Sequence, residues 1–251
     1  MIMIARRIKL YAIKTIVILS LRNLVNIFLL EKMIKFLTLQ ILNIFDFFHK
    51  KKILTFLKQK KFHTFEIVFD VGAHRGETIE FYIKYFNIKK LYSFEPSYLS
   101  FDILKKRIDK FKNKNINTNI VIENIAFGKN NKKIKMKHMG ESSSSTIKDL
   151  NTNSKYFKKK QKLLLNFKKN IFKEIFVEQK TLDEYMSQKK IKKLDFLKID
   201  TEGYEFEVLS GAKKNIKNIK LVLFEHHYHD MIKKNYKFGD VHALLNKNNL
   251  N

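Results

Sequence analysis

The chain has 251 residues, which is enough for one α/β domain with an extension or for two small domains. Its composition, with 45% hydrophobic and 30% charged residues, is that of a globular protein, and the absence of cysteine excludes disulfides, thiolate nucleophiles and cysteine-ligated metal centres. The formal charge of +27 would suit a nucleic-acid partner. Only five of the 51 basic residues are arginine, however, so we interpret the charge as a lysine-coated surface and expect no specific nucleic-acid partner.

Residues 1–62 form an apolar and basic block that we expect to be a helical extension of the domain after it. The stretch Ile13–Leu30 is interrupted by Arg22 and two asparagines, and the uncharged stretch Phe36–Phe45 has only ten residues, so neither provides the roughly 20 apolar residues of a membrane span. We see no signal-peptide cleavage site and expect a cytoplasmic protein. Amphipathic helices here could cap the following domain, which we favour, or lie on the inner surface of a membrane.

From residue 63 onward, apolar strand patterns alternate with helical patterns. The expected strands are Glu66–Val71, Leu91–Phe94, Asn119–Ile125, Lys133–Met139, Phe172–Glu178, Leu194–Ile199 and Leu221–Glu225. The expected helices are Thr78–Phe86, Ser97–Phe111, Lys155–Asn170, one starting at Thr181, Glu205–Ile216 and Asp240–Asn246, with a polar loop at Glu141–Thr146. This alternation predicts an α/β fold with a doubly wound, mostly parallel sheet.

The first chemical motif is a strand that runs through a glycine turn into a helix. It reads Phe69-Asp70-Val71-Gly72-Ala73-His74-Arg75-Gly76-Glu77-Thr78. Ligands of open α/β sheets lie beyond the carboxyl ends of the strands, where a glycine admits a ligand to the backbone and the helix N-terminus offers free N–H groups. A purely structural strand–helix turn would fit the same pattern.

Glu95 ends the next strand, 25 residues after Asp70, where an acid commonly accepts hydrogen bonds from ribose hydroxyls. The two features together predict an adenosine-type ligand. The loop has only Gly72 and Gly76, which disfavours a nicotinamide oxidoreductase, and no Walker motif is present. S-adenosylmethionine has no phosphate and suits a loop with fewer glycines; Asp70 could reach its ammonium group. The rivals are that oxidoreductase and a non-enzymatic basic protein that binds nucleic acid.

A third motif places carboxylates at the end of a buried strand. Leu194–Ile199 is followed by Asp200-Thr201-Glu202-Gly203, with Glu205 in the next helix. Several carboxylates in one crevice are unfavourable unless they are used, for example as a general base or as cation ligands. The alternative is that Asp200 only caps the following helix.

A fourth motif, Glu225-His226-His227-Tyr228-His229-Asp230, follows the last expected strand. Neighbouring side chains of an extended segment point in opposite directions, and no H-E-x-x-H pattern is present, so we assign no metal site. A histidine has a pKa near neutrality, which makes His226 a candidate base.

In these motifs the chain resembles the FkbM-type family of S-adenosylmethionine-dependent methyltransferases over roughly residues 65–250. The resemblance rests on the glycine motif, Phe94-Glu95-Pro96, Asn124-Ile125-Ala126, Ser142–Ser145, Thr181-Leu182-Asp183-Glu184 and Lys198–Glu205. It implies a class I, Rossmann-like methyltransferase fold and methyl transfer, usually to a hydroxyl oxygen. It also implies that the cofactor is lined by Asp70, Gly72, Ala73, His74, Gly76, Thr78 and Glu95, with Asn124 and Ala126 near the adenine. The family usually has asparagine at the position of His74.

The resemblance also sets the expected chemistry and its limits. A glycan or small-molecule hydroxyl would be the acceptor, and the candidate bases, in order, are Asp200, Glu202 and His226. Such domains usually end with a β-hairpin, but only 26 residues follow Glu225. We therefore expect an incomplete C-terminal hairpin, either because the chain is a fragment or because the N-terminal block covers the sheet edge.

Overall fold

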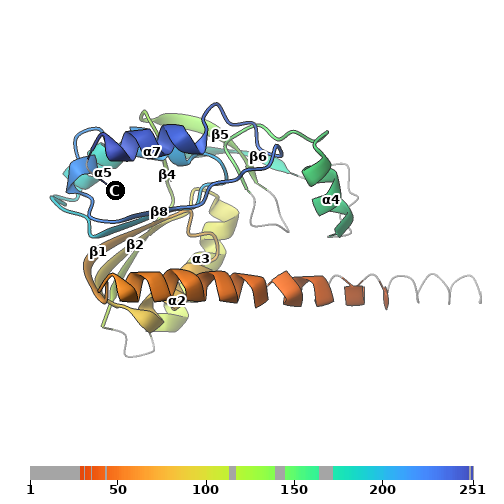
Figure 1. Cartoon of the computed structure of the whole chain (residues 1–251), viewed down its shortest axis with the longest axis horizontal. Helices are drawn as coiled ribbons and strands as arrows, with labels where there is room; N and C mark the ends of the chain where they lie inside the picture. The colour runs from red at the N-terminus through yellow and green to blue at the C-terminus, as the bar shows by residue number, and fades with distance from the viewer. Residues whose placement is uncertain are drawn as a thin grey trace, which may run out of the picture. The chain divides into compact units, whose positions relative to one another are not determined.

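The computed structural model describes residues 29–250 apart from 31, 35, 43, 113–116, 139–144, 164–171 and 249. Most of the predicted serine-rich loop and the end of the predicted helix Lys155–Asn170 therefore lie outside the described residues. The chain divides into two compact units, and the larger one, Leu54–Lys158 with Lys168–Asn251, holds every strand that the structure describes. The predicted α/β fold, mostly parallel and Rossmann-like, is confirmed (Figure 1).

The main sheet has five parallel strands in the order β3-β2-β1-β7-β8. Its strands are β1 (Thr64–Val71), β2 (Asn87–Phe94), β3 (Asn119–Glu123), β7 (Phe196–Ile199) and β8 (Val222–Phe224). Val71 pairs with Phe94 on one side and with Ile199 on the other, so the carboxyl ends of these strands are level. The chain leaves β1 toward β2 and later returns to β7 on the opposite side of β1. The sheet therefore has a topological switch point between β1 and β7, where ligands of such folds bind.

A second sheet, which the sequence did not predict as separate, has the order β4-β6-β5. It contains β4 (Ala126–Phe127), β5 (Lys132–His138) and β6 (Lys173–Lys180), with β5 antiparallel to β6. The predicted strand Asn119–Ile125 is divided between the two sheets. It ends at Glu123, and the Asn124 amide donates to the carbonyls of Glu95 and Pro96 before the chain continues as β4.

Helices cover both faces of the main sheet (Figure 1). One face carries α2 (Glu77–Tyr85) and α3 (Tyr98–Lys112), and the other carries α5 (Leu182–Gln188) and α7 (Phe238–Asn246). Other described helices are α4 (Lys155–Leu163), α6 (Glu205–Ser210) and the short 3-10 helix Ile216–Asn218, besides the helical residues before β1. Because the sheet is covered on both faces, its strands are nearly continuous apolar runs rather than alternating ones.

Helix α6 is shorter than the predicted Glu205–Ile216 because it ends against a close backbone contact. Gly211 follows its last residue, and a Cβ there would lie 2.2 Å from the carbonyl oxygen of Gly128. The chain therefore turns at this glycine and resumes as the separate 3-10 helix.

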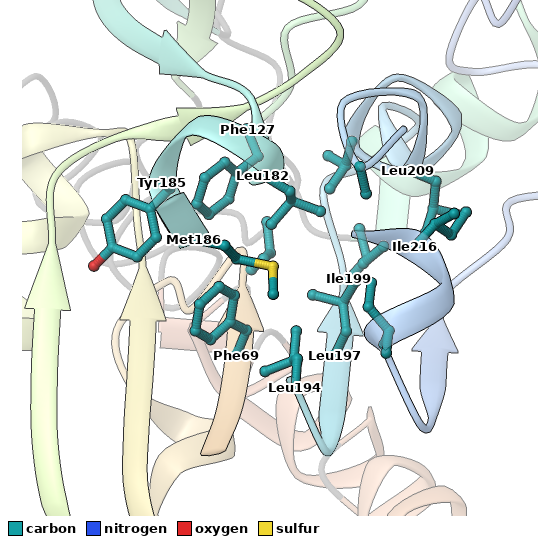
Figure 2. Close-up of a cluster of buried hydrophobic side chains, with 14 of the residues drawn as sticks. Phe69, Phe127, Leu182, Tyr185, Met186, Leu194, Leu197, Ile199, Leu209 and Ile216 are labelled. Atoms are coloured by element: carbon teal, nitrogen blue, oxygen red, sulfur yellow. The ribbon is translucent and has the colours of Figure 1, made fainter. Parts of the chain in front are cut away.

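Buried apolar residues lie on both faces of the main sheet: Val68 and Phe196 pack on the side of α2 and α3, and the cluster in Figure 2 packs on the side of α5. Figure 2 shows Phe69 of β1 and Leu197 and Ile199 of β7 pointing toward the side chains of α5. From α5 come Leu182, Tyr185 and Met186, each at most 2% exposed. This packing holds β1 and β7 rigidly side by side, which fixes the strand ends where ligands of such folds bind.

The described residues between 29 and 59 are helical, and the predicted helical segment before them lies outside the described residues. Within the part of the chain that the structure describes, no helix combines the length and the hydropathy needed to cross a bilayer. At the other end of the chain, no described strand follows β8, which pairs only with β7 and is therefore an edge of the main sheet.

Candidate active site

One glycine and three acidic residues lie at the carboxyl edge of the main sheet, because each of them directly follows a strand. Gly72 follows β1, Glu95 follows β2, Asp200 follows β7 and Glu225 follows β8. Since these strands are parallel and level, their ends meet at the switch point. The sequence predicted the first three positions as site residues, and the structure adds Glu225.

The glycine loop after β1 is shaped by three residues in the left-handed region, Gly72 (φ 84°), His74 (φ 49°) and Gly76 (φ 87°). A Cβ on Gly72 would lie 1.8 Å from the carbonyl oxygen of Asp200, so only glycine allows the loops after β1 and β7 to approach this closely. Asparagine and histidine tolerate the left-handed conformation better than most residues. This explains why His74 can replace the asparagine that is usual at this position in the family that the chain resembles.

The loop leads into an uncapped helix N-terminus. Gly76 is the N-cap of α2 and offers no side-chain hydrogen bond to the first turn. The predicted residue Thr78 is half-buried in that first turn, and Ala73 is buried, with its N–H donating to the carbonyl of Phe94 at 3.0 Å. The N-terminal N–H groups of α2 therefore have no capping side chain at the switch point, and Glu77 and Glu80 place acidic side chains in the same first turn.

Glu95 is buried beside this loop, with only 5% of its surface exposed. Its two carboxyl oxygens accept hydrogen bonds from the backbone N–H groups of His74 (2.8 Å) and Ser97 (2.9 Å). Burial raises the pKa of Glu95 to about 7 despite these donors. Each oxygen keeps a second lone pair, so the carboxyl can accept further hydrogen bonds from a ligand.

Two residues were expected near the adenine. The first, Asn124, directly follows β3, and its side-chain amide donates hydrogen bonds to the carbonyls of Glu95 and Pro96 at the end of the neighbouring strand β2. Ala126 is 4% exposed in β4. The structure thus brings Asn124 next to Glu95, and the adenine contacts of both residues stay predictions.

A buried lysine, which no pattern in the sequence marks as a site residue, lies at the centre of the edge. The Lys198 ammonium of β7 lies 3.1 Å from Asp70 Oδ1 and 3.3 Å from Asp200 Oδ2, and it donates to the Gly72 carbonyl at 3.3 Å. Burial alone would lower the pKa of Lys198, but Asp70 and Asp200 raise it, so the ammonium stays charged.

Asp70 is fully buried. Burial raises the pKa of Asp70, while Lys198 opposes that shift. The structure therefore pairs Asp70 with a resident ammonium group, and its predicted contact with a ligand ammonium stays a prediction.

Asp200 is the more accessible partner of Lys198, with 34% of its side chain exposed. Burial alone would raise the pKa of Asp200, but the Lys198 ammonium lowers it, so Asp200 is a carboxylate at neutral pH. The alternative that Asp200 caps the following helix is wrong, because the N-cap of α6 is Tyr204 and no side chain caps this helix.

Glu205 was expected to line the same crevice as Asp200. Instead its side chain lies inside the domain and holds the loop after β7 by hydrogen bonds. It is fully buried, and its Oε1 accepts hydrogen bonds from the N–H groups of Thr201 (3.2 Å) and Gly203 (3.0 Å). Its Oε2 accepts from the Tyr236 hydroxyl. These bonds hold the strained loop in which Glu202 has φ 53° and Gly203 has φ 92°.

The segment after β8 brings a histidine, His227, to this loop. Its Nε2 lies 3.1 Å from Glu202 Oε2, and its Nδ1 lies 3.9 Å from Glu225 Oε1. Burial would lower the pKa of His227, but Glu202 raises it. Glu225 donates a side-chain hydrogen bond to Asp200, and partial burial together with the Asp200 charge raises the pKa of Glu225 to about 7.

His226, the predicted candidate, lies among aromatic rings instead. Its ring centroid is 4.7 Å from that of Tyr228 and 5.6 Å from that of Phe238. Burial lowers the pKa of His226. Its catalytic role stays a prediction. No signal in the sequence distinguishes it from His227, because the two-residue alternation of β8 stops at Phe224.

Within the described residues, no group of three or more histidine, aspartate or glutamate side chains is placed to hold a metal ion. The arrangement is a pair of interacting carboxyls, Asp200 and Glu225, flanked by an ammonium and an imidazole. Such a group can accept a proton from a ligand near neutral pH.

Comparison with known proteins supports the resemblance seen in the motifs. A family model described as "Methyltransferase FkbM domain" matches residues 70–250. A crystal structure of Methyltransferase FkbM from Methylobacillus flagellatus KT is similar, with 15% sequence identity and a TM-score of 0.47. That similarity covers 73% of this chain and 37% of the other, so the chain spans little more than a third of that protein. A search of the curated proteins found no match.

Proposed function

The chain belongs to the FkbM methyltransferase domain family, and from that premise we propose that it transfers a methyl group from S-adenosylmethionine to a hydroxyl oxygen of a glycan or another small metabolite. Family membership decides against the nicotinamide oxidoreductase. The observation that carries the proposal is the group of Lys198, Asp200 and Glu225 beside the glycine loop. This group lies next to the loop that would bind the cofactor, so a binding site and a candidate base are found at the same edge of the sheet.

The residues present fit S-adenosylmethionine. The uncapped N-terminus of α2 suits the ligand's carboxylate, and Glu95 has lone pairs left for the ribose hydroxyls. Gly72 and Gly76 give the loop its left-handed turns, and the loop lacks the third glycine that a pyrophosphate needs. When bound, the cofactor supplies an electrophilic methyl group.

The residues of the chain would then remove the proton of the acceptor. A hydroxyl is a poor nucleophile until its proton leaves, and the partly exposed Asp200 carboxylate is placed to accept that proton. Lys198 keeps Asp200 ionised and ties it to the Gly72 carbonyl. Glu225 tunes the basicity of Asp200, because a protonated Glu225 donates a hydrogen bond to it and an ionised Glu225 repels its charge.

A donor-labelled transfer screen tests the proposed function. The full chain is incubated with methyl-labelled S-adenosylmethionine and with glycans, lipid-linked sugars and small hydroxylated metabolites. We expect label on the oxygen of at least one class. Label found only on nitrogen or carbon would contradict O-methylation while leaving methyl transfer intact.

We expect Glu95→Ala to weaken cofactor binding. The substitution removes a buried acceptor, and a hydrogen bond to a charged group contributes about 1.5–3 kcal/mol, which corresponds to roughly a tenfold or larger loss of affinity. Calorimetric titration with S-adenosylmethionine at about pH 8, where Glu95 is ionised, measures it. The control is Glu66→Ala, an exposed glutamate at the other end of β1. Unchanged affinity in Glu95→Ala would remove Glu95 from the binding site.

We also expect the transfer rate to rise with pH through an apparent pKa of about 7 or somewhat lower. The pKa of Glu225 is raised toward that value, and the exposed half of its side chain limits the shift through contact with water. As Glu225 loses its proton, Asp200 becomes the stronger base, so the rate increases with pH. In Glu225→Gln the amide donates to Asp200 at every pH, and this rise should vanish from the kcat–pH profile. A wild-type profile retained in Glu225→Gln would contradict the pairing.

A further inference from the structure

The helix between residues 29 and 59 carries a dense set of apolar side chains that the proposed chemistry does not use. The large apolar residues 42% or more exposed between positions 29 and 48 are Leu29, Leu30, Met33, Ile34, Phe36, Leu37, Leu39, Ile41, Leu42, Ile44, Phe45, Phe47 and Phe48. Contiguous apolar surface of this extent is rare on a soluble monomer and marks an interaction site.

Six of these thirteen residues form a stripe along one side of the helix. Leu30, Ile34, Leu37, Ile41, Ile44 and Phe48 recur at alternating intervals of four and three, which places them along one stripe. Lys32, Asp46, His49 and Lys50 fall on the opposite side. The segment is therefore amphipathic along this stripe, and Leu39 is an exposed apolar residue among the polar side chains of the opposite side.

The charge of the segment is strongly biased. Residues 29–61 contain eight lysines against two acidic residues, Glu31 and Asp46, and Asp46 is paired with Lys50 at 2.8 Å. Lys50, Lys51 and Lys52 follow directly after the apolar stretch. A basic amphipathic helix with phenylalanines on its apolar face is typical of segments that lie in the plane of an anionic membrane surface.

A second copy of the chain is the competing partner, because the same stripe could form a coiled-coil seam. That seam would bury only the stripe and would leave Phe36, Leu39 and Leu42 on its outer side. The positions flanking the stripe include Met33, Phe45 and Phe47, where coiled coils carry charges that select the partner. The seam also ends at Lys51. The wide apolar face suits a lipid surface better than a narrow helix–helix contact.

We propose that residues 29–53 bind the surface of an anionic lipid bilayer, with the apolar face of the helix among the acyl chains and Lys50, Lys51 and Lys52 at the headgroups. The helix lies in the interface and does not cross the bilayer. This assigns the segment a partner other than the domain cap that the sequence favoured, and it holds whether or not the proposed methyl acceptor is correct.

Vesicle flotation of the full chain tests this proposal. Vesicles of phosphatidylcholine alone are compared with vesicles that also contain phosphatidylglycerol. We expect the chain to float with the anionic vesicles, at least about tenfold more tightly than with the neutral ones, and to be released as the salt concentration rises. Lys50→Gln/Lys51→Gln/Lys52→Gln should weaken binding to anionic vesicles by about 100-fold.

A matched pair of double variants tests the apolar face. Ile41→Ser/Phe45→Ser leaves the charge unchanged and should weaken vesicle binding by about 100-fold or more. Asp46→Ser/His49→Ser alters the polar face and removes one negative charge, so it should bind anionic vesicles at least as tightly as the wild type. All four positions are exposed, so circular dichroism should show intact folding in both variants.

Three results would overturn the proposal. One is a wild-type chain that stays with the unbound fraction in both vesicle preparations. Another is equal binding to neutral and anionic vesicles. The third is a dimer in analytical ultracentrifugation that Ile41→Ser/Phe45→Ser dissociates, in a chain that does not float, because that outcome would assign the apolar face to a second copy.

Discussion

Asp200→Asn should lower kcat by about 10²–10⁴-fold, the range that general acid–base catalysis typically contributes. The amide has nearly the shape of the carboxylate but cannot accept the hydroxyl proton. Lys198 still has Asp70 as a partner, so the fold should persist. A base that acts only in the transition state changes kcat with little effect on cofactor affinity. The measurement is kcat with the acceptor found in the transfer screen, together with calorimetric cofactor affinity.

A matched control lies on the same strand segment. Asp195 precedes β7 and accepts hydrogen bonds from the backbone N–H groups of Glu66 (2.8 Å) and Ile67 (3.0 Å) at the opposite edge of the sheet. Asp195→Asn makes the same chemical change away from the reacting edge and should leave kcat near the wild-type value. Equal turnover in Asp200→Asn and Asp195→Asn would exclude Asp200 as the base and leave Glu202, His226 and His227 as candidates.

The positions of the strand ends could be predicted because each buried apolar strand is followed by a glycine or a charged residue. Gly72, Glu95 and Asp200 each interrupt an apolar run, and parallel strands bring such interruptions to a common edge. The sequence therefore predicted that these three residues lie at one edge of the sheet, and the strand ends confirm it. It also predicted a parallel sheet, since strands and helices alternate.

Other parts of the candidate site could not be predicted, because they depend on pairing between distant segments. Lys198 is one of many lysines in the sequence, and nothing local shows that it is 7% exposed between two aspartates. The only available signal was its place inside the apolar run Leu194–Ile199, where a buried charge requires a partner. Which of His226 and His227 reaches Glu202 depends on how the chain turns after β8, and in the structure it is His227.

The second sheet was missed for a related reason. Apolar alternation identifies β5 and β6 as strands, but it carries no information about which sheet they join. The division of Asn119–Ile125 into β3 and β4 is set by Asn124, whose amide bonds the backbone at the end of β2. That contact is long-range and has no local pattern.

Lys198→Met should destabilise the domain by about 3–5 kcal/mol, because it leaves the fully buried Asp70 without its counter-charge. Urea denaturation measures the free energy of unfolding. The control is Lys89→Met, whose ammonium lies 3.0 Å from Glu66 on an exposed surface and whose loss should change stability by about 0.5 kcal/mol at most.

The pH dependence of that loss identifies Asp70 as its source. Burial already raises the pKa of Asp70, and without Lys198 the shift becomes larger. The folded state then binds the Asp70 proton more tightly than the unfolded state, so stability is lost as pH rises and recovered as pH falls. The stability deficit of Lys198→Met relative to wild type should therefore shrink as the pH falls from about 8 to about 5.

Asp70→Asn/Lys198→Met, which removes both charges, should be more stable than Lys198→Met at about pH 8 and should lack this dependence. A deficit independent of pH, or one that the second substitution does not relieve, would show that Lys198 stabilises the fold by packing rather than by neutralising Asp70.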